Sequence, residues 1–377
     1  MSKTRMQELG DLGQSLWLDN ISRSMIEQGK LKGLIDQGLR GQTSNPTIFK
    51  QAISQSTDYD AKIVEMTGAG KSTFEIYDDL TIRDVRDACD LFKGVYESTN
   101  ALDGYVSLEI NPHLANTYEE QRDEGLRLWQ KVNRPNLMIK VPGTRNGCRA
   151  FSDLLAKGVN VNVTLIFSAE QYQDVAWAYL NGMKRLSETT KDLSRVRSVA
   201  SVFVSRIDTT IDKTLSDKAA ATTDAALRAK YEGLQGRAAV ANSEIIFHKY
   251  GQLFAGPEFK ALEAFGAKTQ RVLWASTGTK NPKYSDIKYI TELIAKPTVN
   301  TVPDKTLEAF IDHGVNKIAM PGDVAGAQKT IQDLRAEGID VGVVCLKLLE
   351  DGLVSFDQSF DELTQSIEEK AKRLTVR

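Results

Sequence analysis

Residues 137–144, LMIKVPGT, place a lysine at the end of an apolar run of β-strand length. Pro142 and Gly143 end that run two residues after Lys140. Burial disfavours the charged ammonium and therefore lowers a lysine pKa. At a pKa of ~10.4 only about one lysine in two thousand is a free amine at pH 7, whereas a pKa of about 7–8 makes a sizeable fraction nucleophilic. A free amine here suits Schiff-base chemistry on a sugar ketone, and the alternative is a lysine that extends from the strand end into solvent.

Polar side chains recur at alternate positions in two other apolar runs. Because strand side chains alternate between faces, Asn160, Asn162 and Thr164 share one face of their run. Ser201 and Phe203 likewise share a face. Polar groups in an apolar interior are costly unless they are hydrogen-bonded. Asn160 lies one step deeper than Asn162, which favours a structural role for it.

Short apolar runs that alternate with longer helical patterns predict βα units. Eight such strands predict an α/β fold, a closed (β/α)8 barrel of the TIM type with additional C-terminal helices. Because no linker interrupts the pattern, we expect a single domain over residues 1–377, with the barrel at about 10–313 and the C-terminal helices at 314–377. The predicted strands are residues 15–19, 41–45, 105–110, 137–141, 159–166, 198–204, 271–276 and 298–302.

Four stretches have helical patterns. Residues 208–262 favour helix by propensity, and residues 304–313 predict a helix capped by Asp304 and ended near Gly314. Residues 322–336 and 357–374 are amphipathic. Active sites of such barrels form at the C-terminal ends of the strands. We therefore expect the chemically capable residues near strand ends to converge on one pocket: Asp19, Asn45, Glu109, Lys140 and Thr164.

Composition narrows the function classes. The chain has 48 Lys and Arg against 50 Asp and Glu and no basic cluster with interleaved aromatics, so we expect no nucleic-acid and no membrane partner. No apolar run reaches the roughly 18 residues of a transmembrane helix, and no signal-peptide core is found. The three cysteines are far apart, which fits a reducing compartment and predicts a cytoplasmic protein. Dinucleotide, P-loop and zinc-protease motifs are missing, so we expect neither cofactor nor metal.

Six segments together resemble the transaldolase family in order and in approximate spacing. They cover roughly residues 10–310 and are WLDN at 17–20, TSNPTIF at 43–49, SLEINP at 107–112, the lysine segment at 137–144, NVNVTLIFS at 160–168 and SVFVSRID at 201–208. The resemblance implies a (β/α)8 barrel whose C-terminal helices pack outside it or fold toward the active-site mouth. It also implies transfer of a dihydroxyacetone unit through a lysine Schiff base.

The resemblance implies catalytic roles, each of which has a structural alternative. Lys140 would be the Schiff-base nucleophile, and Asp19 would be the general acid/base at bond cleavage rather than a cap of its turn. Glu109 would activate a proton-shuttling water held by Thr164, and the alternatives are a buried partner for Lys140 and a structural hydroxyl. Direct pairing would raise the lysine pKa and oppose catalysis, so we expect a water between Lys140 and Glu109.

The resemblance also implies a substrate site. Asn45, Asn162 and Ser201 would bind sugar hydroxyls, with Phe203 lining the same site. Pro46 follows Asn45, restricts its backbone and so fixes the approach of its side chain. The alternative for Asn45 is a turn asparagine.

Phosphate binding is implied for two further segments. Arg206 matches the family's phosphate-binding arginine, and the alternative is an ion pair with Asp208. Many family members carry a second arginine after strand seven, in the context Ala-Ser-x-Arg-Asn. Here the segment is ASTGTKNP at 275–282, so Ser276 and Lys280 are candidate ligands, although two residues are added and lysine replaces arginine.

The implied reaction takes a ketose phosphate, sedoheptulose 7-phosphate or fructose 6-phosphate, as donor. The acceptor would be glyceraldehyde 3-phosphate or erythrose 4-phosphate, in the non-oxidative pentose phosphate pathway, and the protein would be a monomer or homodimer. One alternative is a fructose 6-phosphate aldolase, although Glu109 and Phe203 favour transfer over release, because related small aldolases usually carry glutamine and tyrosine there. Another is an inactive sugar-phosphate-binding barrel, which would be expected to lose Lys140, Asp19 or Glu109.

Overall fold

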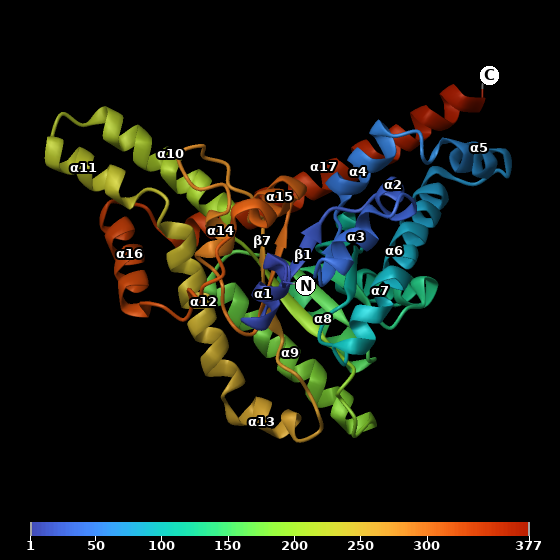
Figure 1. Ribbon diagram of the computed structural model, residues 1–377, viewed down its shortest axis with the longest axis horizontal. Coiled ribbons are helices and arrows are strands. Elements are labelled where there is room, and N and C mark those ends of the chain that lie inside the picture. The colour runs from blue at the N-terminus through green and yellow to red at the C-terminus, as the bar shows by residue number, and fades with distance from the viewer. Residues whose placement is uncertain (1, 376–377) are drawn as a thin grey trace.

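Eight parallel strands close into a barrel in the computed structural model, which describes residues 2–375 (Figure 1). Each strand pairs with its neighbour in sequence, and the last strand pairs with the first. The strands are β1 Gln14–Asp19, β2 Gly41–Thr43, β3 Tyr105–Glu109, β4 Leu137–Pro142, β5 Val161–Ile166, β6 Ser198–Phe203, β7 Arg271–Ala275 and β8 Thr298–Val302. The predicted (β/α)8 barrel is confirmed, with every predicted strand end within two residues of the observed one.

The end of β2 shows how the sequence turns a strand into a helix at the barrel rim. We predicted a strand to residue 45, but it stops at Thr43. Asn45 instead caps α4 (Pro46–Gln55), because its Oδ1 accepts a hydrogen bond of 2.9 Å from the Ile48 amide. Pro46 then occupies the first helical turn, where its missing N–H costs nothing.

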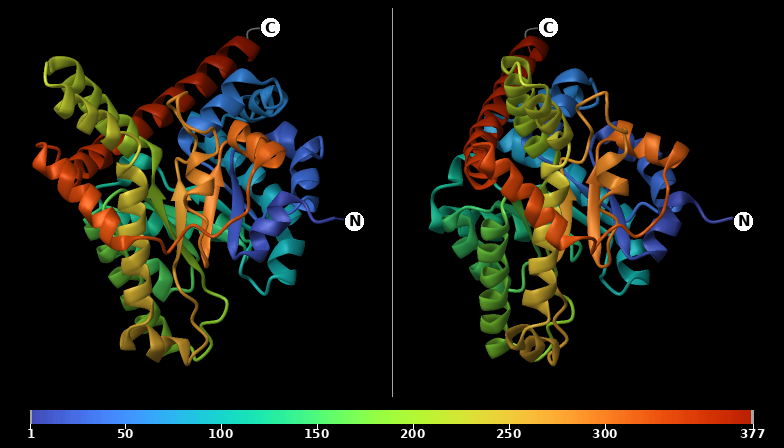
Figure 2. Two further views of the ribbon diagram at one scale, coloured as in Figure 1. Left: turned by 60° about the vertical axis from the view of Figure 1, so that its left-hand side comes forward. Right: turned by 90° about the vertical axis from the view of Figure 1, so that its left-hand side faces the viewer.

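Helices surround the barrel on its outside (Figures 1 and 2). Those of the N-terminal half are α1 Arg5–Asp11, α2 Arg23–Glu27, α3 Lys30–Asp36, α4, α5 Asp60–Gly68, α6 Thr73–Ser98, the 3-10 turn η1 Pro112–Leu114, α7 Tyr118–Val132, α8 Arg145–Ala156 and α9 Ala169–Thr189. Those of the C-terminal half are α10 Ser205–Ala221, α11 Ala225–Leu234, α12 Ala238–Phe254, α13 Pro257–Glu263, α14 Lys288–Thr291, α15 Asp304–His313, α16 Val324–Ala336 and α17 Val341–Thr375. Within residues 2–375 no helix is both long enough and apolar enough to cross a membrane.

Two helix predictions need correction in detail. Residues 208–262 are four helices, α10 to α13, because Asp224 caps a new helix and Gly236 adopts a φ of +69°. Pro257 then opens α13. Asp304 is the first residue of α15 rather than its cap, and its carboxylate accepts a hydrogen bond of 2.6 Å from Asn20.

The final helix is much longer than predicted. It begins at Val341 rather than at residue 357, and buried residues recur along it every three or four positions, among them Cys345, Leu348, Gly352 and Phe356. This helix, α17, packs on α4, α5 and α6. Figure 2 shows it crossing the end of the barrel toward which the strand arrows point. The sequence left open whether the C-terminal helices pack outside or fold toward the mouth, and α17 passes over the mouth.

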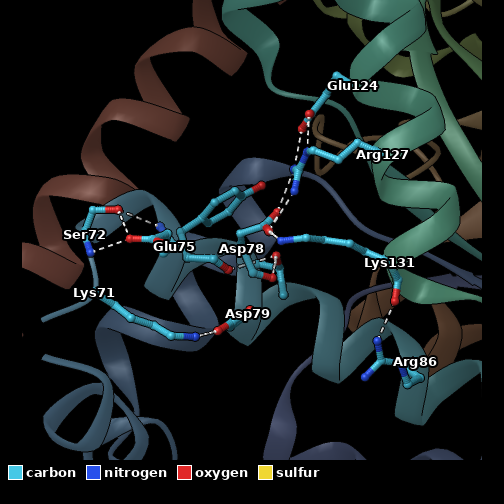
Figure 3. A network of polar contacts seen from close by, with 11 residues as sticks. Lys71, Ser72, Glu75, Asp78, Asp79, Arg86, Glu124, Arg127 and Lys131 are labelled. Carbon is cyan, nitrogen blue, oxygen red and sulfur yellow. Dashed lines mark hydrogen bonds and ion pairs between the residues drawn. The ribbon is translucent and has the colours of Figure 1, made fainter. Parts of the chain in front are cut away.

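A buried carboxylate joins two of the outer helices (Figure 3). Asp78 of α6 is only 3% exposed and accepts hydrogen bonds of 2.7 and 2.8 Å from Arg127 of α7, with another of 2.7 Å from Lys131. Burial raises the pKa of Asp78, but the hydrogen bonds from Arg127 and Lys131 outweigh burial and hold that pKa below its usual range. The carboxylate therefore stays ionised and links α7 to α6. These are the helices before and after β3 in the sequence.

Candidate active site

A cavity of about 160 Å³ lies at the C-terminal ends of the strands. Nine of the eleven sequence-predicted site residues line it: Asp19, Asn45, Lys140, Thr164, Ser201, Phe203, Arg206, Ser276 and Lys280. The other two, Glu109 and Asn162, lie next to it and contact residues of its wall. Residues from β1, β4, β5 and β6 and from the loops after β2 and β7 thus meet at one place, although they are far apart in the sequence.

Lys140 is buried and donates to two oxygen atoms. Its side chain is 6% exposed, and Nζ donates to the Ser44 carbonyl at 3.1 Å and to Glu109 Oε2 at 3.3 Å. We expected a water between lysine and glutamate, and the structure corrects that expectation. The barrel register places Glu109 on β3 directly beside Lys140 on β4, so the two side chains meet without an intermediary.

The carboxylates of Glu109 and Asp19 both interact electrostatically with Lys140. Burial raises the pKa of Glu109 above its ordinary value, although the charge of Lys140 opposes the rise. Burial likewise raises the pKa of Asp19, against the charge of Lys140 and a hydrogen bond of 2.7 Å from Thr43 Oγ1. Each group therefore holds a proton more readily than a carboxyl in water does. Raised carboxyl pKa values beside a buried amine are the conditions for general acid–base chemistry.

A hydrogen-bonded chain lies below the cavity. The Asn162 amide donates to Ser107 Oγ at 3.1 Å and accepts from Ser201 Oγ at 2.6 Å. Asn162 therefore orients Ser201, which lines the cavity, rather than facing the cavity itself. Asn160 binds the backbone of three other residues, which agrees with the structural role expected for it.

Thr164 and Asn45 have hydrogen-bonding capacity left over. Thr164 Oγ1 is buried at the cavity wall and has no hydrogen-bond partner within the part of the chain that the structure describes. The oxygen of the Asn45 amide is occupied by capping α4, so its nitrogen remains the group to offer a ligand.

The far side of the cavity is cationic. Arg206 lies in the first turn of α10, where the helix dipole favours an anion, and its guanidinium lies 5.3 Å from the centre of the Phe203 ring. Asp208 is not its partner, because that carboxylate accepts from the Ala239 amide and the Tyr289 hydroxyl. Within residues 2–375 no carboxylate forms an ion pair with Arg206.

Ser276 and Lys280 complete this side. Ser276 has a φ of +53°, which is strained for a residue with a side chain, and its Oγ lies 3.2 Å from Ser205 Oγ. Lys280 is exposed and lines the same cavity as Arg206. The two cations thus reach one cavity, although Lys280 is on a longer loop than the family pattern implies.

Sequence reasoning missed an aromatic residue that covers the lysine. Phe356 of α17 is 5% exposed, lines the cavity, and has its ring centre 5.7 Å from Lys140 Nζ. The regular spacing of apolar residues along 341–356 could have indicated a helix with one buried face, but not that this face covers Lys140. Thr301 of β8 was also missed, and its Oγ1 lies 2.7 Å from Thr43 Oγ1, which in turn binds Asp19.

The fold and the cavity define a barrel enzyme with a buried lysine and two carboxylates at the ends of its strands. A family model described as Transaldolase/Fructose-6-phosphate aldolase matches residues 16–367. The chain is 43% identical, over the whole of both chains, to a protein of Trichodesmium erythraeum named Transaldolase. It is 44% identical to the Transaldolase of Saccharopolyspora erythraea over 98% of each chain, and 43% identical to that of Mycolicibacterium smegmatis over 94% of each. The chain therefore belongs to the transaldolase family, and the resemblance read from the sequence is confirmed.

Proposed function

We propose that this chain is a transaldolase that moves a dihydroxyacetone unit from a ketose phosphate to an aldose phosphate. The donor is fructose 6-phosphate or sedoheptulose 7-phosphate, and the acceptor is glyceraldehyde 3-phosphate or erythrose 4-phosphate. The observation that carries the proposal is the buried Lys140, which contacts Glu109 in a cavity that also contains Asp19 and Arg206. A reactive amine, a proton acceptor and a phosphate-binding cation are the three groups that this reaction requires.

We expected direct pairing of Lys140 and Glu109 to oppose catalysis, but their contact also gives a route to the free amine. When a proton passes from the ammonium to the carboxylate, two buried charges become two neutral groups, which burial favours. The amine then adds to the ketone carbon and forms a carbinolamine. Glu109 returns its proton to the carbinolamine hydroxyl, which leaves as water and yields the protonated imine. Thr164, whose Oγ1 has no hydrogen-bond partner within residues 2–375, holds the water that carries a proton between Glu109 and the carbinolamine.

Asp19 acts at the second stage. Its carboxylate takes the proton of the C4 hydroxyl, so that the bond between C3 and C4 breaks and its electrons pass into the imine. The aldose phosphate leaves, and the three-carbon unit stays on Lys140 as an enamine. Addition to the acceptor reverses these steps, and Asp19 returns the proton. Thr43 and Thr301 hold Asp19 in place through their linked hydroxyls.

Substrate binding divides between the two sides of the cavity. Asn45 and Ser201 bind sugar hydroxyls, and Asn162 fixes the direction of Ser201. Arg206, at the N-terminus of α10, binds the phosphate, with Ser276 and Lys280 beside it. Phe203 packs under the guanidinium and restricts its movement.

The family description covers aldolases as well as transaldolases, so transfer must be separated from release. Glu109 and Phe203 favour transfer, as do the curated relatives, which carry the name Transaldolase. The test supplies fructose 6-phosphate alone and then together with erythrose 4-phosphate. A transaldolase forms sedoheptulose 7-phosphate only in the second mixture. Equal release of free dihydroxyacetone in both mixtures would instead identify an aldolase.

We also propose a cytoplasmic enzyme of the pentose phosphate pathway, active as a monomer or homodimer. Barrel and C-terminal helices act as a single domain, a proposal supported by the position of Phe356 of α17 in the wall of the cavity.

A further inference from the structure

A second cavity, of about 290 Å³, lies at the opposite end of the barrel, where the strands begin. Arg271, the first residue of β7, and Arg197, which directly precedes β6, line it. Its outer wall includes residues of α13, the helix at the bottom of Figure 1. Met138 forms part of the wall and lies two positions before Lys140 on the same face of β4, so the cavity begins where the barrel interior ends. It shares no residue with the candidate active site.

Among the described residues, no carboxylate forms an ion pair with the buried Arg197. It is 6% exposed, and its guanidinium donates to the backbone carbonyls of Ser194, Val196 and Asn100. Its Nε is buried and has no hydrogen-bond partner within residues 2–375. A buried positive charge is costly unless an anion or a full set of acceptors compensates it. Carbonyl dipoles supply part of that compensation, but these three acceptors do not satisfy the full set of N–H donors that a guanidinium carries.

Arg271, in the same cavity, differs from Arg197 because a carboxylate balances its charge. It is also 6% exposed, but it forms an ion pair of 2.8 Å with Asp103 and donates to Ser15 Oγ at 2.9 Å. Asp103 therefore neutralises Arg271, whereas no carboxylate within residues 2–375 does the same for Arg197. Exposed Lys268 adds a third cation to the wall, and exposed Glu263 is the one carboxylate among the described residues that line it.

Oxyanions fit this arrangement better than other small ligands do. Guanidinium groups recognise phosphate through paired, charge-assisted hydrogen bonds, and a lysine at the mouth adds a flexible charge. Asn100, Thr99 and Thr269 supply neutral polar groups to the same wall. The volume exceeds that of a single water by about tenfold, so the cavity has room for a phosphate group with a small organic part.

We propose that this cavity is a second anion site, which binds a tetrahedral oxyanion of the phosphate class between Arg197 and Lys268. The proposal is independent of the reaction assigned to the first cavity. Its ligand is free phosphate or the phosphate group of a small ester, since both present the same oxygens to the guanidinium.

The test must first weaken phosphate binding at the active site. Arg206→Ala serves as the parent protein, and inorganic phosphate is titrated by calorimetry against sodium chloride of equal ionic strength. Arg197→Gln and Lys268→Gln are then added separately to that parent. Lys93→Gln is the matched control, because Lys93 is exposed on α6 and lines neither cavity.

The parent protein should bind one phosphate. Arg197→Gln should weaken that binding by roughly ten- to a hundredfold, and Lys268→Gln by several-fold, with no change from Lys93→Gln. If Arg197→Gln does not fold, Lys268→Gln decides, because the side chain of Lys268 is exposed. Glycerol phosphate in place of phosphate identifies the source: tighter binding assigns an ester, and equal binding assigns the free ion. No phosphate binding by the parent, or binding that neither Arg197→Gln nor Lys268→Gln weakens, would overturn the proposal.

Discussion

Lys140 Nζ lies 3.3 Å from Glu109 Oε2, and both side chains are more than nine-tenths buried. They occupy paired positions on neighbouring strands, so the contact is fixed by the register of β3 and β4 and not by flexible loops. Burial raises the pKa of Glu109 and favours the neutral form of its carboxyl. The pair is thus a proton donor and acceptor placed together before any substrate binds.

Glu109→Gln should slow imine formation. Glutamine keeps the size of the side chain but can neither accept the proton of the ammonium nor return one to the carbinolamine. General acid–base groups typically contribute ~10²–10⁴-fold, and a loss of that order is expected. Rapid-quench trapping of the imine with borohydride measures this step directly. An unchanged rate of trapping would remove Glu109 from the mechanism.

Asp19→Asn should affect the later step. The imine should still form at close to the normal rate, while turnover falls by ~10²–10⁴-fold, because the C4 hydroxyl proton has no acceptor. Because Asp19 must be ionised to act and burial raises its pKa, wild-type kcat should fall on the acid side at a pH above the ordinary carboxyl value. The kcat–pH profile checks this, and an acid limb at or below the ordinary carboxyl pKa would contradict it.

Arg206→Ala should raise the KM for fructose 6-phosphate by roughly ten- to a hundredfold, as expected for the loss of charged hydrogen bonds worth ~1.5–3 kcal/mol. Lys280→Ala should raise it less, because Lys280 is exposed and offers a single flexible charge. Unphosphorylated fructose is the control substrate and should be nearly indifferent to both changes. An unchanged KM in Arg206→Ala would mean that the phosphate binds elsewhere. An unchanged KM in Lys280→Ala would mean that this lysine is only a solvated loop residue.

Phe356→Ala should increase the release of free dihydroxyacetone. The ring covers Lys140, and its loss admits water, which protonates the enamine at carbon and then hydrolyses the resulting imine, so that dihydroxyacetone leaves and the amine of Lys140 is restored. The ratio of free dihydroxyacetone to transferred product should rise several-fold, whereas Val354→Ala, an exposed change on the same helix, should not alter it. Product analysis by chromatography gives the ratio. An unchanged ratio in Phe356→Ala would show that α17 does not exclude water.

Asp78→Asn should lower the free energy of unfolding by about 1–3 kcal/mol at pH 7, because a buried ionised acceptor is lost between α6 and α7. The folded pKa of Asp78 is depressed, so its contribution is complete above the unfolded value of about 3.9 and is lost as pH falls through the folded pKa. Urea denaturation at pH 7 and at acid pH should show the two proteins converging at low pH. Asp79→Asn, which removes an exposed partner of Lys71, is the control and should cost under about 1 kcal/mol. Equal losses from the two changes would contradict the role of Asp78.

The strands were predictable because alternation and turn residues are local signals, as LMIKVPGT shows for β4. The contact between Lys140 and Glu109 was not, because it depends on how β3 and β4 are staggered in the closed barrel. Strand alternation correctly put Asn162 and Ser201 in the interior, but it could not say that one binds the other. Phe356 could not be placed over Lys140 because only packing decides where a C-terminal helix lies.

Formation of a Schiff base on Lys140 is tested by mapping the adduct that borohydride traps. The protein is reduced with borohydride in the presence of fructose 6-phosphate, digested, and analysed by mass spectrometry. We expect a three-carbon adduct on the peptide that contains Lys140, and none with Lys140→Arg, a change that keeps a positive charge beside Glu109. An adduct on another lysine, or equal labelling of Lys140→Arg, would show that Lys140 is not the nucleophile.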